Sequence, residues 1–112
     1  MEENVRLAYL YDFYGELLKE DQRELYSAFV FDDLSLQELA DERGISRQAV
    51  HDRVKRCINS MEEYERQLGL IDKYHRIEEL TKEIAASPLL AGGDAAERER
   101  VLLLLDRITE VL

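Results

Sequence analysis

The side chains best suited to chemistry in this 112-residue chain are polar and basic ones gathered in residues 46–56. Arg47 and Gln48 carry forked donors that can read guanine and adenine edges, and Lys55 suits a phosphate. Asp52 could accept from a cytosine amino group, but it would equally repel a nucleic-acid backbone. The predicted nucleic-acid-binding residues are Ser46, Arg47, Gln48, His51, Asp52, Arg53, Lys55 and Arg56.

The distribution of charge singles out the same segment. The formal net charge of −10 argues against a general nucleic-acid binder, because such proteins are basic. Residues 43–56 reverse the sign, with five Lys or Arg against one Asp. Residues 1–42 hold three basic residues against twelve acidic ones, and residues 57–112 hold seven against twelve. The cationic island therefore coincides with the predicted interface, although basic residues that merely neutralise acidic neighbours would give the same pattern.

The elements that must position these side chains are two short helices joined by a tight turn, over residues 35–56. Ser35 opens a capping box for the first helix, and Gly44 can take the positive φ that the turn requires. Ser46 caps the second helix, whose Val50 faces inward. This pattern is a helix-turn-helix, which places a helix in the DNA major groove. The alternative is a three-helix core unit that binds no nucleic acid.

The second helix of this motif continues well beyond the length of a minimal recognition helix. Apolar residues recur on it at alternating spacings of four and three, which is a heptad seam about 33 Å long at about 1.5 Å per residue. Such a seam needs a partner, either another helix of the same chain or the same helix of a second subunit. The seam residues are Val50, Val54, Cys57, Met61, Tyr64 and Leu68.

Helical periodicity covers the rest of the chain as well. Helix-forming residues dominate and Pro88 is the single proline, so we expect an all-α fold. A Ser-Pro pair and a Gly-Gly pair bracket a loop at residues 87–93. The expected helices outside the motif cover residues 4–18, 20–30, 70–86 and 94–112.

The last helix has an apolar face too wide for an isolated surface helix, so it must pack on something. The last two helices are natural material for a homodimer. We therefore expect a helix-turn-helix domain at residues 1–68, with the motif at 35–56, and C-terminal helices for packing and dimerisation at residues 69–112.

No constellation for catalysis is apparent. His51 and His75 lie far apart in the sequence, and neither accompanies a plausible nucleophile. The single cysteine, Cys57, excludes an intramolecular disulfide and a cysteine-based metal cluster. Asp32 and Asp33 lack a third ligand nearby, which favours a turn over a metal site. We expect no enzyme, no catalytic residue, no cofactor and no metal.

The amino-acid sequence also lacks the patterns of a targeting signal. The chain holds no run of about eighteen apolar residues that could span a membrane. Its first residues, MEENVRL, do not follow the charged-then-apolar order of a signal sequence. We expect a cytoplasmic protein.

Residues 17–56 resemble the promoter-binding domain at the C-terminus of bacterial sigma factors, known as region 4. More closely, DFYGELL at residues 12–18, SRQAVHD at residues 46–52 and MEEYERQLGLIDKY at residues 61–74 resemble the YlxM-like family of helix-turn-helix regulators associated with the signal recognition particle. The similarity covers about residues 5–80, and the remaining C-terminal residues carry no further matching motif.

The resemblance implies a small bacterial cytosolic protein with an all-helical, sigma-region-4-like fold. Members of that family are encoded beside the particle's GTPase and are associated with regulation of protein targeting. The implied partners are DNA, or the RNA or protein of the particle. The family's helix-turn-helix positions fall on Ser46, Arg47, Gln48, His51, Asp52 and Lys55. Two alternatives stay open: a sequence-specific DNA-binding transcription regulator unrelated to the particle, and a protein-interaction adaptor that does not bind DNA.

Overall fold

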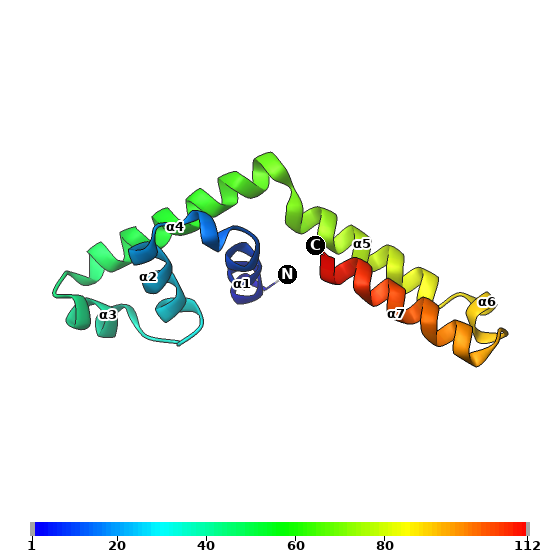
Figure 1. Ribbon diagram of the computed structural model, residues 1–112. Helices are drawn as coiled ribbons and strands as arrows, with labels where there is room; N and C mark the ends of the chain where they lie inside the picture. Colours follow the sequence, from blue (N-terminus) through cyan, green and yellow to red (C-terminus); the bar gives the residue numbers. More distant parts are fainter. Residues whose placement is uncertain (1, 112) are drawn as a thin grey trace. The chain divides into compact units, whose positions relative to one another are not determined.

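A computed structural model describes residues 2–111, which fold into helices with no β-strand in that range (Figure 1). The all-α prediction is therefore confirmed. None of the helices in this part of the chain is both long and apolar enough to cross a membrane. The elements are α1 (Glu3–Tyr14), the 3-10 turn η1 (Gly15–Leu17), α2 (Glu20–Val30), α3 (Leu36–Arg43), α4 (Arg47–Leu68), α5 (Leu70–Ala85), α6 (Pro88–Ala91) and α7 (Ala95–Val111).

The chain divides after Gly69 into two compact units, which we call the N-terminal unit and the C-terminal unit. In the N-terminal unit, α1, α2 and α3 all pack against α4. The core around the motif consists of Leu25, Leu39, Ala40, Val50 and Val54, with partly buried Ala28, Phe29, Leu34, Leu36, Ile45 and Ile58 packed on it. Because these three helices pack against α4, they determine which part of the α4 surface remains exposed to solvent.

The first helix is shorter than predicted. It ends at Tyr14, and residues 15–17 form the 3-10 turn η1 in place of more α-helix. Gly15 allows this close turn, since a Cβ atom at that position would lie 2.8 Å from the Tyr11 ring. Leu18 then adopts an extended backbone, and its N–H donates to the carbonyl of Gly15 at 3.1 Å.

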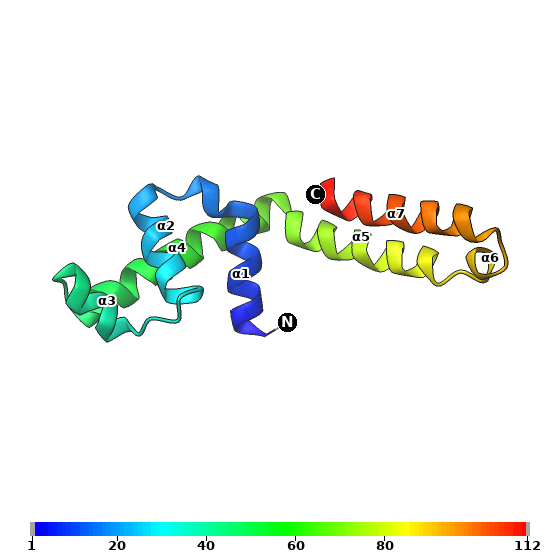
Figure 2. The ribbon, with the colours of Figure 1, turned by 60° about the horizontal axis from the view of Figure 1, so that its bottom comes forward.

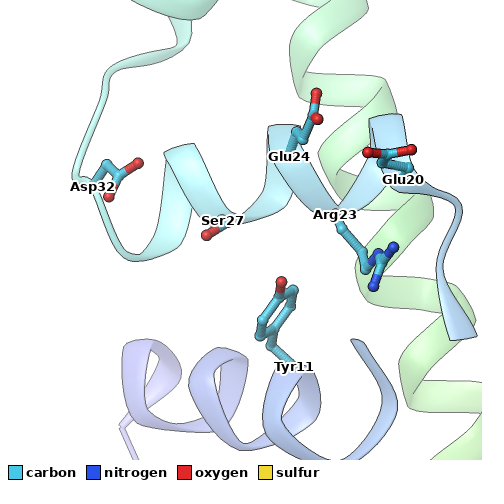
Figure 3. A pocket seen from close by; sticks show the side chains of 6 residues that line it. All are labelled: Tyr11, Glu20, Arg23, Glu24, Ser27 and Asp32. Carbon is cyan, nitrogen blue, oxygen red and sulfur yellow. The ribbon is translucent and has the colours of Figure 1, made fainter. Parts of the chain in front are cut away.

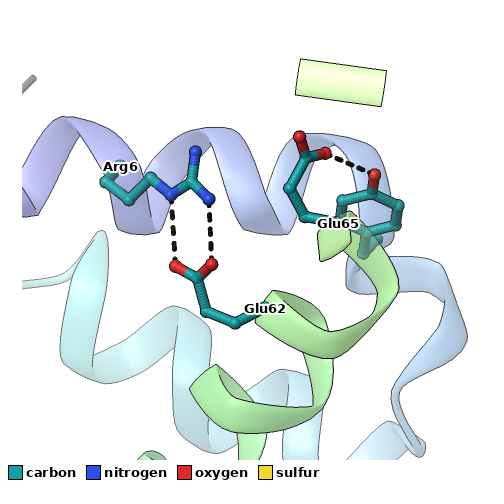
Figure 4. A network of polar contacts seen from close by, with 4 residues as sticks. Arg6, Glu62 and Glu65 are labelled. Atoms are coloured by element: carbon teal, nitrogen blue, oxygen red, sulfur yellow. Dashed lines mark hydrogen bonds and ion pairs between the residues drawn. The ribbon is translucent and has the colours of Figure 1, made fainter. Parts of the chain in front are cut away.

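Polar contacts tie α1 to the C-terminal half of α4. Arg6 donates two hydrogen bonds to the Glu62 carboxylate, at 2.8 and 3.1 Å, and Figure 4 shows the two side chains facing each other. The Tyr14 hydroxyl donates to Oε1 of Glu65 at 2.6 Å, and both side chains are buried. These contacts anchor the part of α4 that lies beyond the helix-turn-helix motif.

The heptad seam finds its partner within the chain over most of its length. Its members from Val50 to Met61 are buried in the N-terminal unit, and Tyr64 is half-buried with its ring 6.0 Å from that of Tyr14. Leu68, the last member of the seam, is 48% exposed and so has no covering partner within the described chain. Leu68 is the last residue of α4, and Gly69 follows it in the left-handed conformation with φ of 63°. Glu65 occupies the buried position of the last turn.

The C-terminal unit is a hairpin in which α5 and α7 lie side by side, as both ribbon views show (Figure 2). The expected loop contains the short helix α6, which starts at Pro88 after the Ser87 hydroxyl accepts the N–H of Leu89. Ile71 and Leu105 are the buried apolar side chains among residues 70–111. Large apolar side chains remain exposed in this unit: Leu70, Leu80, Ile84, Leu89, Leu103, Leu104, Ile108 and Val111.

Candidate nucleic-acid interface

The helix-turn-helix geometry follows from three local signals. The Ser35 hydroxyl accepts the N–H of Glu38 at 3.0 Å while the Glu38 carboxylate accepts the N–H of Ser35 at 3.3 Å, which completes the predicted capping box. Gly44 has φ of 67° and ends α3 in the left-handed conformation. The Ser46 hydroxyl accepts the N–H of Ala49 at 3.0 Å and starts α4. These predictions are confirmed.

All eight predicted interface residues are exposed, because Val50 and Val54 turn the opposite side of α4 into the core. They span a wide arc of the α4 surface. Since successive residues of an α-helix are roughly 100° apart, His51 and Arg53 lie on different sides of the buried Val50–Val54 line. We call the edge of this arc on the side of His51 the outer face, and the edge on the side of Arg53 the second flank.

The outer face includes a shallow hollow of about 410 Å³ lined by Leu36, Arg47, Gln48 and His51. Leu36 is the first residue of α3, so the hollow brings the beginning of that helix next to the beginning of α4. This arrangement leaves the donors of Arg47 accessible from solvent at the open side of the motif. In helix-turn-helix proteins that bind DNA, residues near the beginning of the second helix contact base edges.

Asp52 binds the predicted base-reading amide of Gln48. Nε2 of Gln48 donates to Oδ1 of Asp52 at 2.9 Å, and Nδ1 of His51 lies 3.4 Å from the same oxygen. The hydrogen bonds from Gln48 and then His51 hold the pKa of Asp52 below its ordinary value. The carboxylate is therefore ionised at neutral pH and engages a donor that a base would otherwise receive. The spacing of four residues between Gln48 and Asp52 could have predicted this contact, because side chains four residues apart on a helix are neighbours.

The second flank contains a cavity of about 210 Å³, which we call the arginine cavity. Arg53 and Arg56 of α4 meet Arg43 there, the last residue of α3. Arg43 was counted in the cationic island but not among the predicted interface residues. The full lining is Asp21, Gln22, Leu25, Arg43, Arg53, Arg56 and Cys57.

A further hollow, between α1 and α2, has the opposite character (Figure 3). It measures about 440 Å³, and Tyr11 points from α1 toward α2 within it. Three carboxylates surround it against one guanidinium group, so it disfavours a phosphate. The lining residues are Tyr11, Glu20, Arg23, Glu24, Ser27 and Asp32.

Reactive side chains do not gather elsewhere in the described part of the chain. No group of three or more His, Cys, Asp or Glu side chains that could hold a metal ion occurs among residues 2–111. Burial, followed by the negative charge of Asp21, raises the pKa of the Cys57 thiol. The thiol therefore stays protonated at neutral pH, as expected for a side chain that packs in the core. Asp33 has φ of 58°, a turn conformation that suits the predicted connection between α2 and α3.

Comparisons with known proteins bear on this geometry. A family model described as "Putative helix-turn-helix protein, YlxM / p13 like" matches residues 1–95. A UPF0122 protein of Shouchella clausii is 40% identical over 111 residues, which cover 99% of this chain and 98% of that protein. Another, of Symbiobacterium thermophilum, is 42% identical over 98 residues, covering 88% and 92%. A third, of Halalkalibacterium halodurans, is 37% identical over 108 residues, covering 96% and 95%.

Proposed function

This chain belongs to the YlxM/p13-like family of helix-turn-helix proteins, and on that basis we propose that it binds nucleic acid through the exposed side of α4. The observation that carries the proposal is the exposure of the cationic island. On a chain of net charge −10, four of the five basic residues in the segment that reverses the sign lie on the second helix of a helix-turn-helix, and all four are exposed. That position is where such motifs contact nucleic acid.

The side chains of this face take different roles in the proposal. Arg47 and Gln48, in the first turn of α4, reach base edges, and Lys55 contacts a phosphate. Ser46 and the beginning of α4 face the same backbone, since a helix N-terminus favours negative charge. Gln48 has to exchange its hydrogen bond to Asp52 for one to a base.

A regulatory role in the signal recognition particle pathway is the finer part of the proposal. It is supported by the family-like motifs at residues 12–18, 46–52 and 61–74, and it places the protein in the cytoplasm. The nucleic acid is then either DNA or the RNA of the particle. One alternative function, that of a protein-interaction adaptor, is favoured by the net charge of −10, because an acidic protein repels any polyanion.

We also propose that the C-terminal unit joins two copies of this chain. Leu104 and Ile108 of α7 are 47% and 48% exposed, and Leu80 and Ile84 of α5 are exposed as well. An identical hairpin can cover these side chains about a two-fold axis, as in a four-helix bundle. Two copies would present two α4 helices to one duplex, which offsets the weak binding expected of an acidic protein.

The dimer has its own test. The full chain at micromolar concentration should show twice the monomer mass by light scattering. The double variant Leu104→Glu, Ile108→Glu should show the monomer mass while keeping its helical circular dichroism. A monomeric mass for the unaltered chain would remove this part of the proposal.

The binding proposal is tested with the Arg47→Ala variant, measured by fluorescence anisotropy on duplex DNA and on the particle's RNA. Loss of a two-pronged base contact should weaken binding about tenfold, with unchanged helical content. Arg98→Ala, which removes an exposed arginine from α7, is the matched control and should bind like the unaltered chain. Equal affinities of the Arg47→Ala variant and the unaltered chain for both nucleic acids would overturn the recognition role.

A further inference from the structure

The arginine cavity lies where three helices of the N-terminal unit meet. The first turn of α2 contributes Asp21 and Gln22, the end of α3 contributes Arg43, and α4 contributes Arg53 and Arg56. Three guanidinium groups therefore surround a space that contains one carboxylate. The three arginines belong to the cationic island at residues 43–56, and the turn between α3 and α4 brings Arg43 beside the other two.

The three arginines are not engaged by the protein. Within residues 2–111, none of Arg43, Arg53 and Arg56 forms an ion pair or donates a side-chain hydrogen bond, whereas Arg6 binds Glu62 through two. Nε of Arg43 is buried and has no acceptor in that range. A buried N–H donor without an acceptor is unfavourable, and a bound anion would satisfy it.

Gln22 adds a further donor. Its Oε1 accepts the N–H of Lys19 at 3.1 Å. That contact orients the side chain and leaves the amide NH₂ group, which donates only, to face other partners. The cavity therefore offers guanidinium and amide N–H groups and opposes them with the single carboxylate of Asp21.

The size of the cavity limits what it can hold. Small-molecule sites usually measure about 300–1,000 Å³, whereas this cavity is about 210 Å³. A nucleoside is therefore too large, but a single tetrahedral oxyanion fits. Guanidinium groups match phosphate oxygens with paired N–H donors, which makes phosphate the favoured anion.

We propose that the arginine cavity is a binding site for one phosphate group, held by the guanidinium groups of Arg43, Arg53 and Arg56. The phosphate comes either from a nucleic-acid backbone or from a free phosphate ion. The first source rests on the proposed function, because Arg53 and Arg56 share α4 with the outer face. The second source does not.

The first experiment uses inorganic phosphate and the full-length chain, at constant ionic strength set with chloride. Side-chain Nε–Hε signals of the arginines are followed by NMR. We expect saturable shifts at Arg43, Arg53 and Arg56. Arg43→Gln should weaken the phosphate affinity seen at the remaining two signals at least about tenfold, as expected for loss of a charge-assisted hydrogen bond.

Two further variants sharpen this test. Asp21→Asn should tighten phosphate binding, because it removes the opposing charge. Arg53→Gln repeats the loss at an exposed position, in case Arg43→Gln disturbs folding. Arg76→Gln, at an exposed position of α5, is the matched control and should leave the affinity unchanged. The absence of saturable shifts, or an equal effect of Arg76→Gln, would overturn the proposal.

The second experiment identifies the source of the phosphate. The salt dependence of binding to duplex DNA is measured for the unaltered chain and for Arg43→Gln. A slope of log K against log salt concentration that falls in magnitude by about 0.9 identifies a backbone phosphate. An unchanged slope, with inorganic phosphate still bound, identifies free phosphate. If the chain binds no nucleic acid, the proposed function fails while the phosphate titration still decides this inference.

Discussion

Replacing Asp52 by Asn should strengthen nucleic-acid binding, although Asp52 lies within the predicted interface. The reason is its place beside Gln48. In the free protein the Asp52 carboxylate accepts the Gln48 amide at 2.9 Å, and its own side chain is 54% exposed. Hydrogen bonds from Gln48 and then His51 keep the pKa of Asp52 below its ordinary value, so the charge is present at any pH used for binding.

The size of the effect follows from two contributions. A contact between side chains four residues apart on a helix stabilises it by about 0.2–0.5 kcal/mol, which binding must give up when Gln48 turns to a base. After Asp52→Asn the side-chain amide oxygen can still accept from Gln48, but more weakly than a carboxylate, so the substitution recovers part of this amount. Two like charges about 4 Å apart in water repel by about 1 kcal/mol, and salt and greater distance reduce this. Together these amount to roughly 1 kcal/mol, or about fivefold in Kd.

The assay is fluorescence anisotropy with labelled duplex DNA and with the particle's RNA at fixed salt. Asp52→Asn should bind about fivefold more tightly than the unaltered chain, and Gln48→Ala should bind more weakly. The double variant Gln48→Ala, Asp52→Asn is compared with Gln48→Ala alone. Without Gln48, the difference in affinity between them reports only the charge effect of Asp52. A weaker Asp52→Asn complex would refute this reasoning and would instead identify Asp52 as a direct acceptor from a base.

Three stability predictions can be checked by thermal unfolding monitored with circular dichroism. Tyr14→Phe removes the hydrogen bond to Oε1 of buried Glu65 and should cost about 1–3 kcal/mol, or roughly 4–20 °C in Tm. Tyr11→Phe is its control, since that hydroxyl makes no hydrogen bond within residues 2–111, and should stay within about 0.5 kcal/mol. Gly44→Ala should cost about 1–2 kcal/mol through φ of 67° alone, because an added Cβ meets nothing within 4 Å. Met61→Ala should cost about 2–5 kcal/mol by opening a cavity beneath α4, and an unchanged Tm would mean that the seam is not packed within the chain.

Features that depend on neighbouring residues could be predicted from the sequence. Ser35, Gly44 and Ser46 act through hydrogen bonds and dihedral angles within a few residues, so their roles follow from residue type and spacing. The exposure of the interface residues follows in the same way, because burial of Val50 determines which side of α4 remains free. The helix-turn-helix was predictable for this reason.

Features that depend on tertiary packing could not be predicted. The heptad pattern did not distinguish a partner helix in the same chain from one in a second subunit, since both satisfy an apolar seam. Glu65 has an ionisable side chain yet is 6% exposed, and its contact with the Tyr14 hydroxyl depends on the packing of α1 against α4. The arginine cavity needs α2, α3 and α4 together, so Arg43 was not among the predicted interface residues.

The central claim, that the exposed side of α4 is the nucleic-acid interface, is tested most directly by a map of backbone amide shifts. The full-length chain labelled with nitrogen-15 is titrated with duplex DNA and, separately, with the particle's RNA. The largest shifts should fall in residues 46–56, with small shifts in α5 and α7. Saturable binding whose shifts are confined to residues 70–111, with residues 46–56 unchanged, would contradict the account.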